Sequence, residues 1–139
     1  MEGFRLVREQ EVEFGDLDGL GHVNNAAYLR YLENAKVAYF REVLGVEELE
    51  ELGIVGDVKI TYRSPAFFGE TLAFGIRIGA VGTKSLTFEF EVRGPDARLV
   101  AEGSSAHVAF DYARRTPVPV PEEWRRRIES HEARSATPA

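Results

Sequence analysis

The sequence contains no cysteine, which excludes disulfide bonds, thiolate nucleophiles and thiolate metal ligands. Histidine is also scarce. The three residues His22, His107 and His131 lie far apart and form no pair at a spacing typical of metal ligands. We therefore expect no metal site in this protein.

Long apolar runs and a basic charge balance are absent as well. No stretch approaches the roughly 18 apolar residues that a membrane-spanning helix requires. The formal net charge is −6, whereas a general nucleic-acid binder presents a basic face. The N-terminus has no apolar run behind a basic start, so we expect no signal peptide. These features predict a cytoplasmic protein that neither spans a membrane nor binds nucleic acid.

The apolar content is sufficient for one buried core, with 139 residues of which 44% are hydrophobic. Between Asn25 and about Leu44, apolar side chains recur at spacings of three and four, which predicts a long helix. Asn24 is a suitable N-cap, and Gly45 stands where a terminating glycine belongs. Such a helix is roughly 30 Å long. Apolar residues cover much of its circumference, so we expect other elements to wrap around it.

The flanking sequence has the alternating period of strands. One run precedes the helix at residues 4–14, and four runs follow it at about 58–63, 72–78, 86–92 and 98–110. Short turn-forming breaks separate the later runs, which indicates antiparallel pairing. The long helix needs burial and the sheet needs a cover. The predicted fold is therefore α+β, with an antiparallel sheet of about five strands wrapped around one central helix, and it resembles the hot-dog fold.

The C-terminal segment is expected to lie outside this domain, which we assign to residues 1–116. Residues 117–139 comprise a proline-rich link, a polar, arginine-rich helix at about 122–131, and a tail of small polar residues that we expect to fray.

The segment Phe14–Asn25 reads FGDLDGLGHVNN and holds two carboxylates, an imidazole and three glycines just before the long helix. Carboxylate and imidazole can act as a base or a nucleophile. A helix start presents unpaired N–H donors and the positive end of a dipole. These are the groups needed to attack and polarise a carbonyl.

The stretch Phe14–Lys36, FGDLDGLGHVNNAAYLRYLENAK, resembles the 4-hydroxybenzoyl-CoA thioesterase family of hot-dog acyl-CoA thioesterases. It is similar to the branch whose motif reads D-x-D-x-x-G-H-V-N-N-x-x-Y-L-x-Y-x-E. The strand order after the motif fits this family to about residue 112. The resemblance implies hydrolysis of an acyl-CoA thioester to free acid and CoA, with no cofactor beyond the CoA of the substrate.

The resemblance also implies roles for individual residues. Asp18, the second aspartate of the motif, would be the nucleophile on the thioester carbonyl or the general base for a water. A backbone N–H at or near Asn25 would be the oxyanion donor. Lys84 and Ser85 would contact the CoA, although Arg114-Arg115 and Arg125–Arg127 are alternative phosphate anchors. Sites in this family lie at subunit interfaces, so we expect a homo-oligomer, and a tetramer rather than a dimer.

For the other residues near the motif, a structural role has to be weighed against a role in the site. His22 would either position the substrate near the thioester or bridge the loop by hydrogen bonds. Asp16 and Asn24 are expected to be structural, the first as a turn partner and the second as a cap. Tyr28 is either a core residue or part of the substrate-binding surface. Glu33 is expected to be structural.

Two other functions remain open from the sequence. A hot-dog hydratase or dehydratase would use His22 and Glu33 and would release no thiol. A non-catalytic acyl-CoA-binding module would bind without turnover. The acyl group is not disclosed, and both aromatic and medium-chain groups fit the pattern.

Overall fold

The computed structural model describes residues 1–135. The main sheet is built from six antiparallel strands, namely β1 (Leu6–Glu11), β2 (Ile54–Val55), β3 (Lys59–Tyr62), β4 (Thr71–Val81), β5 (Ser85–Arg93) and β6 (Leu99–Val108). The helices are α1 (Asn25–Glu42) and α2 (Glu122–Ser135), with 3-10 turns η1 (Phe14–Asp16) and η2 (Leu49–Glu51). A separate hairpin pairs β7 (Phe110–Asp111) with β8 (Thr116–Pro117).

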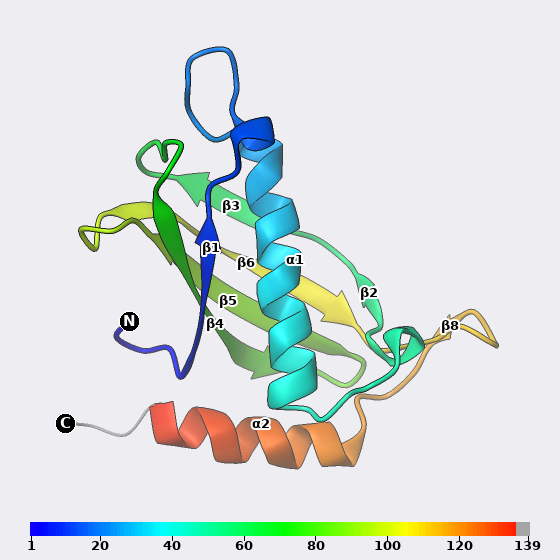
Figure 1. Cartoon of the computed structure of the whole chain (residues 1–139). Coiled ribbons are helices and arrows are strands. Elements are labelled where there is room, and N and C mark those ends of the chain that lie inside the picture. Colours follow the sequence, from blue (N-terminus) through cyan, green and yellow to red (C-terminus); the bar gives the residue numbers. More distant parts are fainter. Residues whose placement is uncertain (136–139) are drawn as a thin grey trace.

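The sheet curls around α1, which lies along its inner face (Figure 1). The strand order is β1-β4-β5-β6, and both β2 and β3 pair with β6 at the far edge. This confirms the predicted α+β architecture. The prediction of about five strands omitted β2, because a two-residue strand is too short to show a period.

The alternation of side chains along the central strands explains the core. In β5, every second residue from Leu86 to Val92 is buried, and the residues between them are half-exposed. The buried side chains face α1, whose Leu32, Tyr39 and Phe40 are almost completely buried. The sheet and the helix therefore share one hydrophobic core.

Both ends of α1 lie close to the predicted positions. The Asn24 side chain accepts a hydrogen bond from the N–H of Ala26, as an N-cap does. At the other end, Gly45 has a φ of +71°, and the next N–H, that of Val46, donates to the carbonyl of Phe40 at 2.9 Å.

α2 crosses beneath the C-terminal end of α1 (Figure 1) and packs against the core through Trp124 and Ile128. The Glu132 carboxylate accepts hydrogen bonds from the Tyr39 hydroxyl at 2.5 Å and from the N–H of Ile78 at 2.9 Å. The helix continues to Ser135, four residues beyond the predicted end. Residues 136–139 of the predicted frayed tail lie outside the described residues.

Candidate active site at the N-terminus of the central helix

The loop between η1 and α1 folds into a small hairpin, with Asp18 at the base of its turn. The backbone of Leu17 pairs with that of Val23, and the N–H of Asp18 donates to the carbonyl of His22 at 2.7 Å. The Asp18 Oδ1 accepts hydrogen bonds from the N–H groups of Leu20 at 2.8 Å and His22 at 3.0 Å. This pattern requires a tight turn, which Gly21 provides with a φ of +83°.

The Asp18 carboxylate is exposed at the surface of this loop. The hydrogen bond from the N–H of Leu20 is the main cause that holds the pKa of Asp18 below its ordinary value, and the N–H of His22 adds to it. Hydrogen bonds from N–H donors favour the ionised form of a carboxyl group. Asp18 is therefore a carboxylate at neutral pH, as either a nucleophile or a general base must be.

Asp16, two residues earlier, has different surroundings. Its carboxylate is buried and accepts hydrogen bonds from the Arg30 guanidinium and the Tyr31 hydroxyl, both on α1. These two partners, with Arg30 first, lower the pKa of Asp16. Its backbone carbonyl accepts the N–H of Asn24 at 2.7 Å. Asp16 thus ties the loop to the first turns of the helix.

The first turn of α1 presents one N–H group that the cap leaves unused. The Asn24 side chain accepts the N–H of Ala26 at 2.8 Å, and the Asn24 carbonyl accepts that of Ala27 at 2.9 Å. The N–H of Asn25 has no intrahelical acceptor because it opens the helix. It is therefore available at the positive end of the helix dipole.

Asp18 and Asn25 line one pocket of about 260 Å³ at this end of the helix. Its other lining residues come from the loop, from α1, and from β3 and the turn after it: His22, Val23, Tyr28, Tyr62, Arg63, Ser64 and Pro65. The structure thus brings together the predicted residues Asp18, His22, Asn25 and Tyr28.

The histidine of the motif is half-buried against another loop. The backbone of His22 pairs with that of Phe67, and the two rings stack edge to face with centroids 5.3 Å apart. These contacts hold the imidazole at the edge of the pocket beside Asp18.

The sequence reasoning missed Tyr62 and Arg63. The Tyr62 hydroxyl donates to the Asn25 carbonyl at 2.9 Å, and the Arg63 guanidinium pairs with Glu102 at 2.9 Å. The alternating run at residues 58–63 indicated a strand, but no local signal indicated that its end meets the helix N-terminus.

Lys84 and Ser85 lie at the opposite end of the molecule from Asp18. β4 begins at Thr71 near the Asp18 loop and runs about 30 Å to Val81, where the turn to β5 starts. That turn contacts α2, because Arg125 donates to the Gly82 carbonyl at 2.6 Å. The fold of this chain therefore does not bring Lys84 and Ser85 to Asp18.

Glu33 is also separate from the pocket. It lies eight residues into α1, about 12 Å along the axis from Asn25. Its carboxylate is exposed and pairs with the buried Lys36 ammonium at 3.3 Å. The sequence reasoning did not single out Lys36. Its Nζ donates a hydrogen bond to the Ser105 hydroxyl on β6 at 2.6 Å.

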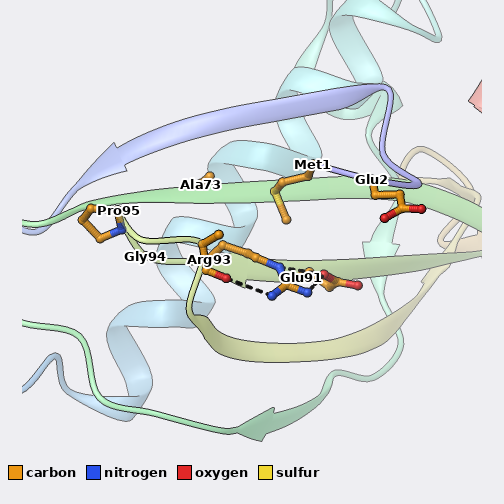
Figure 2. A pocket seen from close by; sticks show the side chains of 8 residues that line it. Met1, Glu2, Ala73, Glu91, Arg93, Gly94 and Pro95 are labelled. Carbon is orange, nitrogen blue, oxygen red and sulfur yellow. Dashed lines mark hydrogen bonds and ion pairs between the residues drawn. The ribbon is translucent and has the colours of Figure 1, made fainter.

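A larger hollow of about 740 Å³ lies over the outer face of the sheet, away from the motif. Figure 2 shows that Glu91 and Arg93 point toward each other in it, and they form an ion pair at 2.8 Å. None of the residues singled out from the sequence lines this hollow. Glu91 and Arg93 already pair with each other, and the hollow lacks every residue of the motif, so the smaller pocket remains the candidate site.

Within residues 1–135, no group of three or more His, Asp or Glu side chains is placed to hold a metal ion. Neither helix of the described chain is long and apolar enough to cross a membrane.

An antiparallel sheet curled around one helix, with a carboxylate loop at that helix's N-terminus, defines a protein of the hot-dog fold. The sequence model of the thioesterase-like superfamily matches residues 12–128, and this chain belongs to that superfamily. The family relationship predicted from the motif is confirmed.

Individual relatives agree with this assignment. A thioesterase from Thermus thermophilus, solved in complex with coenzyme A and zinc, is 34% identical, covers 100% of both chains and has a TM-score of 0.88. The Bacillus subtilis (strain 168) protein named "Putative acyl-CoA thioesterase YneP" is 26% identical over 75% of this chain and 78% of its own length. The 1,4-dihydroxy-2-naphthoyl-CoA thioesterase Slr0204 from Synechocystis shares the fold, with 21% identity, a TM-score of 0.77, and coverage of 88% of this chain and 93% of its own.

Proposed function

We propose that this protein is an acyl-CoA thioesterase, which hydrolyses an acyl-CoA thioester to the free acid and CoA. The observation that carries the proposal is that the Asp18 carboxylate and the N-terminus of α1 at Asn25 line the same pocket. Superfamily membership and the relative solved with coenzyme A support the substrate class.

In this proposal the thioester carbonyl oxygen lies against the N–H of Asn25. The N–H and the helix dipole stabilise the negative charge that develops on this oxygen when the carbonyl is attacked. Loss of one such donor typically slows a reaction by about 10²–10³-fold.

Asp18 acts in one of two ways. As a nucleophile, its free oxygen forms a bond to the carbonyl carbon, the C–S bond breaks, and the resulting mixed anhydride is hydrolysed by water. As a general base, it takes a proton from the water that attacks the same carbon. In both cases CoA leaves as the thiolate, and His22 at the pocket edge positions the substrate or assists the leaving sulfur.

We further propose that the enzyme is a homo-oligomer, with a tetramer favoured over a dimer. Phe14, Leu20 and Phe68 around the Asp18 loop are 75%, 80% and 59% exposed. Clustered exposed apolar side chains mark interaction surfaces. A second copy that covers them could bring its own Lys84 and Ser85 to the CoA. Light scattering of the purified protein measures the mass of the assembly directly.

We also propose that the enzyme is cytoplasmic, as predicted from the sequence. CoA thioesters are intracellular metabolites, so the proposed substrate fits a cytoplasmic enzyme.

The proposal is tested by thiol release from a panel of aromatic, short, medium and long acyl-CoAs, with wild type beside Asp18→Asn. The asparagine keeps an oxygen for the N–H groups of Leu20 and His22 but removes the charge, so we expect kcat to fall by about 10²-fold or more. Asp96→Asn is the matched control, since Asp96 is also an exposed turn aspartate that accepts a backbone N–H.

Full activity of Asp18→Asn at saturating substrate would show that the assigned mechanism is wrong. If no acyl-CoA in the panel releases thiol from the wild type, the thioesterase proposal itself fails. Hydration of an enoyl thioester and binding without turnover would then be measured for the two alternative functions.

A further inference from the structure

The Tyr62 side chain forms a wall of the Asp18 pocket that the proposed mechanism does not use. Tyr62 lies at the end of the edge strand β3, and the residue is 39% exposed. The hydroxyl donates to the Asn25 carbonyl at 2.9 Å, and the ring centroid lies 5.4 Å from that of Tyr28. The backbone of β3 pairs with β6, so the residue is held at both ends.

Tyr28 closes the pocket behind this wall. It is only 2% exposed and belongs to the core, and burial is the main cause that raises its pKa to about 12. Leu32, one turn further along the same face of α1, is completely buried. The space between α1 and the sheet beyond Tyr28 is therefore filled by packed side chains.

The size of the pocket agrees with this closure. Its volume of about 260 Å³ is below the usual range for small-molecule sites, which is about 300–1,000 Å³. A longer acyl chain would therefore have to extend out of this pocket past the Tyr62 ring, which lines it.

We propose that Tyr62, with Tyr28 behind it, determines the acyl specificity of the enzyme and restricts it to compact groups, a short chain or a single aromatic ring. This rests on the proposed thioesterase function and names the substrate class of that same site. Tyr62 is a specificity-determining residue here, because its exposed ring occupies the volume that a longer chain would need.

The experiment compares kcat/KM for acetyl-, butyryl-, benzoyl-, decanoyl- and palmitoyl-CoA. Tyr62→Ala removes the wall, Tyr62→Phe keeps the ring and removes only the hydroxyl, and Tyr62→Leu is a milder truncation in case the alanine variant does not fold. Tyr112→Ala is the remote control, since Tyr112 is also exposed and also donates its hydroxyl to a backbone carbonyl, that of Gly53.

For the wild type we expect at least about a tenfold preference for butyryl- and benzoyl-CoA over decanoyl-CoA. Tyr62→Ala or Tyr62→Leu should raise the decanoyl-to-butyryl ratio by about tenfold, while Tyr62→Phe and Tyr112→Ala should leave it unchanged. A wild type that hydrolyses decanoyl-CoA as well as butyryl-CoA would overturn the proposal. So would a folded truncation variant that keeps the wild-type ratio.

Failure of the proposed function gives a different result, namely no thiol from any substrate. In that case the same acyl-CoAs are titrated calorimetrically into wild type and Tyr62→Ala. The size limit is supported if the short-chain and aromatic thioesters bind more tightly than the long-chain ones to the wild type, and if Tyr62→Ala loses this preference. Equal binding of all lengths refutes it.

Discussion

At the scale of single residues, Asp16 and Asp18 show how position decides the role of a carboxylate. The two are separated by one residue, and both have a pKa below the ordinary value. Asp16 is buried and its partners are side chains of α1, whereas Asp18 is exposed and its partners are N–H groups of its own loop. The first carboxylate therefore fixes the loop, and the second is free to meet a substrate.

This contrast predicts opposite phenotypes for Asp16→Asn and Asp18→Asn. Asp16→Asn weakens a buried charge-assisted interaction with Arg30 and Tyr31, so it should lower the free energy of unfolding by about 1–3 kcal/mol. Asp18→Asn should leave the urea midpoint near that of the wild type while thiol release falls. Equal losses of stability in the two variants would contradict this division of roles.

At the scale of elements, α2 contacts both α1 and the place in β4 where the strand register shifts. The register of β4 against β5 shifts between Ile78 and Ala80. The Glu132 carboxylate accepts the N–H of Ile78 there and the hydroxyl of Tyr39 on α1. One side chain of α2 thus satisfies polar groups from two other elements.

Glu132→Ala should therefore destabilise the protein. The change leaves the Ile78 N–H and the Tyr39 hydroxyl without this acceptor, which we expect to cost about 1–3 kcal/mol. Glu129→Ala, which removes an exposed carboxylate from the preceding turn, is the control and should change little. Chemical denaturation measures both. Similar midpoints for the two variants would mean that the Glu132 contacts contribute nothing to stability.

At the scale of the whole molecule, burial of His107 couples stability to pH. The ring packs on Phe40 with centroids 4.9 Å apart, and its Nε2 contacts the Leu52 carbonyl. In the described part of the chain its buried Nδ1 has no hydrogen-bond partner. Burial is the main cause that lowers the pKa of His107 below its ordinary 6.5, and the nearby Lys36 ammonium lowers it further.

The expected consequence is a loss of stability in mild acid. Below pH 6.5 the unfolded chain binds a proton at this histidine that the folded protein does not bind, so folding becomes less favourable as the pH falls. The test is the urea midpoint between about pH 5 and 8 for wild type and His107→Asn. We expect the wild-type midpoint to fall more steeply with acid. Parallel profiles would assign the pH dependence to other groups.

The sequence by itself determined the features that depend on neighbouring residues. The periods of α1 and of the long strands, the Asn24 cap and the Gly45 terminus follow from local conformational preferences and from which side chains avoid water. The motif placed the Asp18 carboxylate just before the helix N-terminus, because the two are neighbours in the sequence. These local signals were enough to predict the fold class and the superfamily.

The tertiary structure alone decided which distant residues meet. Tyr62 reaches Asn25 across 37 residues of sequence, Asp16 pairs with α1, and Lys36 is buried against Ser105. Lys84 and Ser85 lie far from Asp18 in the fold, because β4 spans the length of the sheet. Such contacts depend on how the strands pair and curl around the helix, and no short segment of sequence encodes that arrangement.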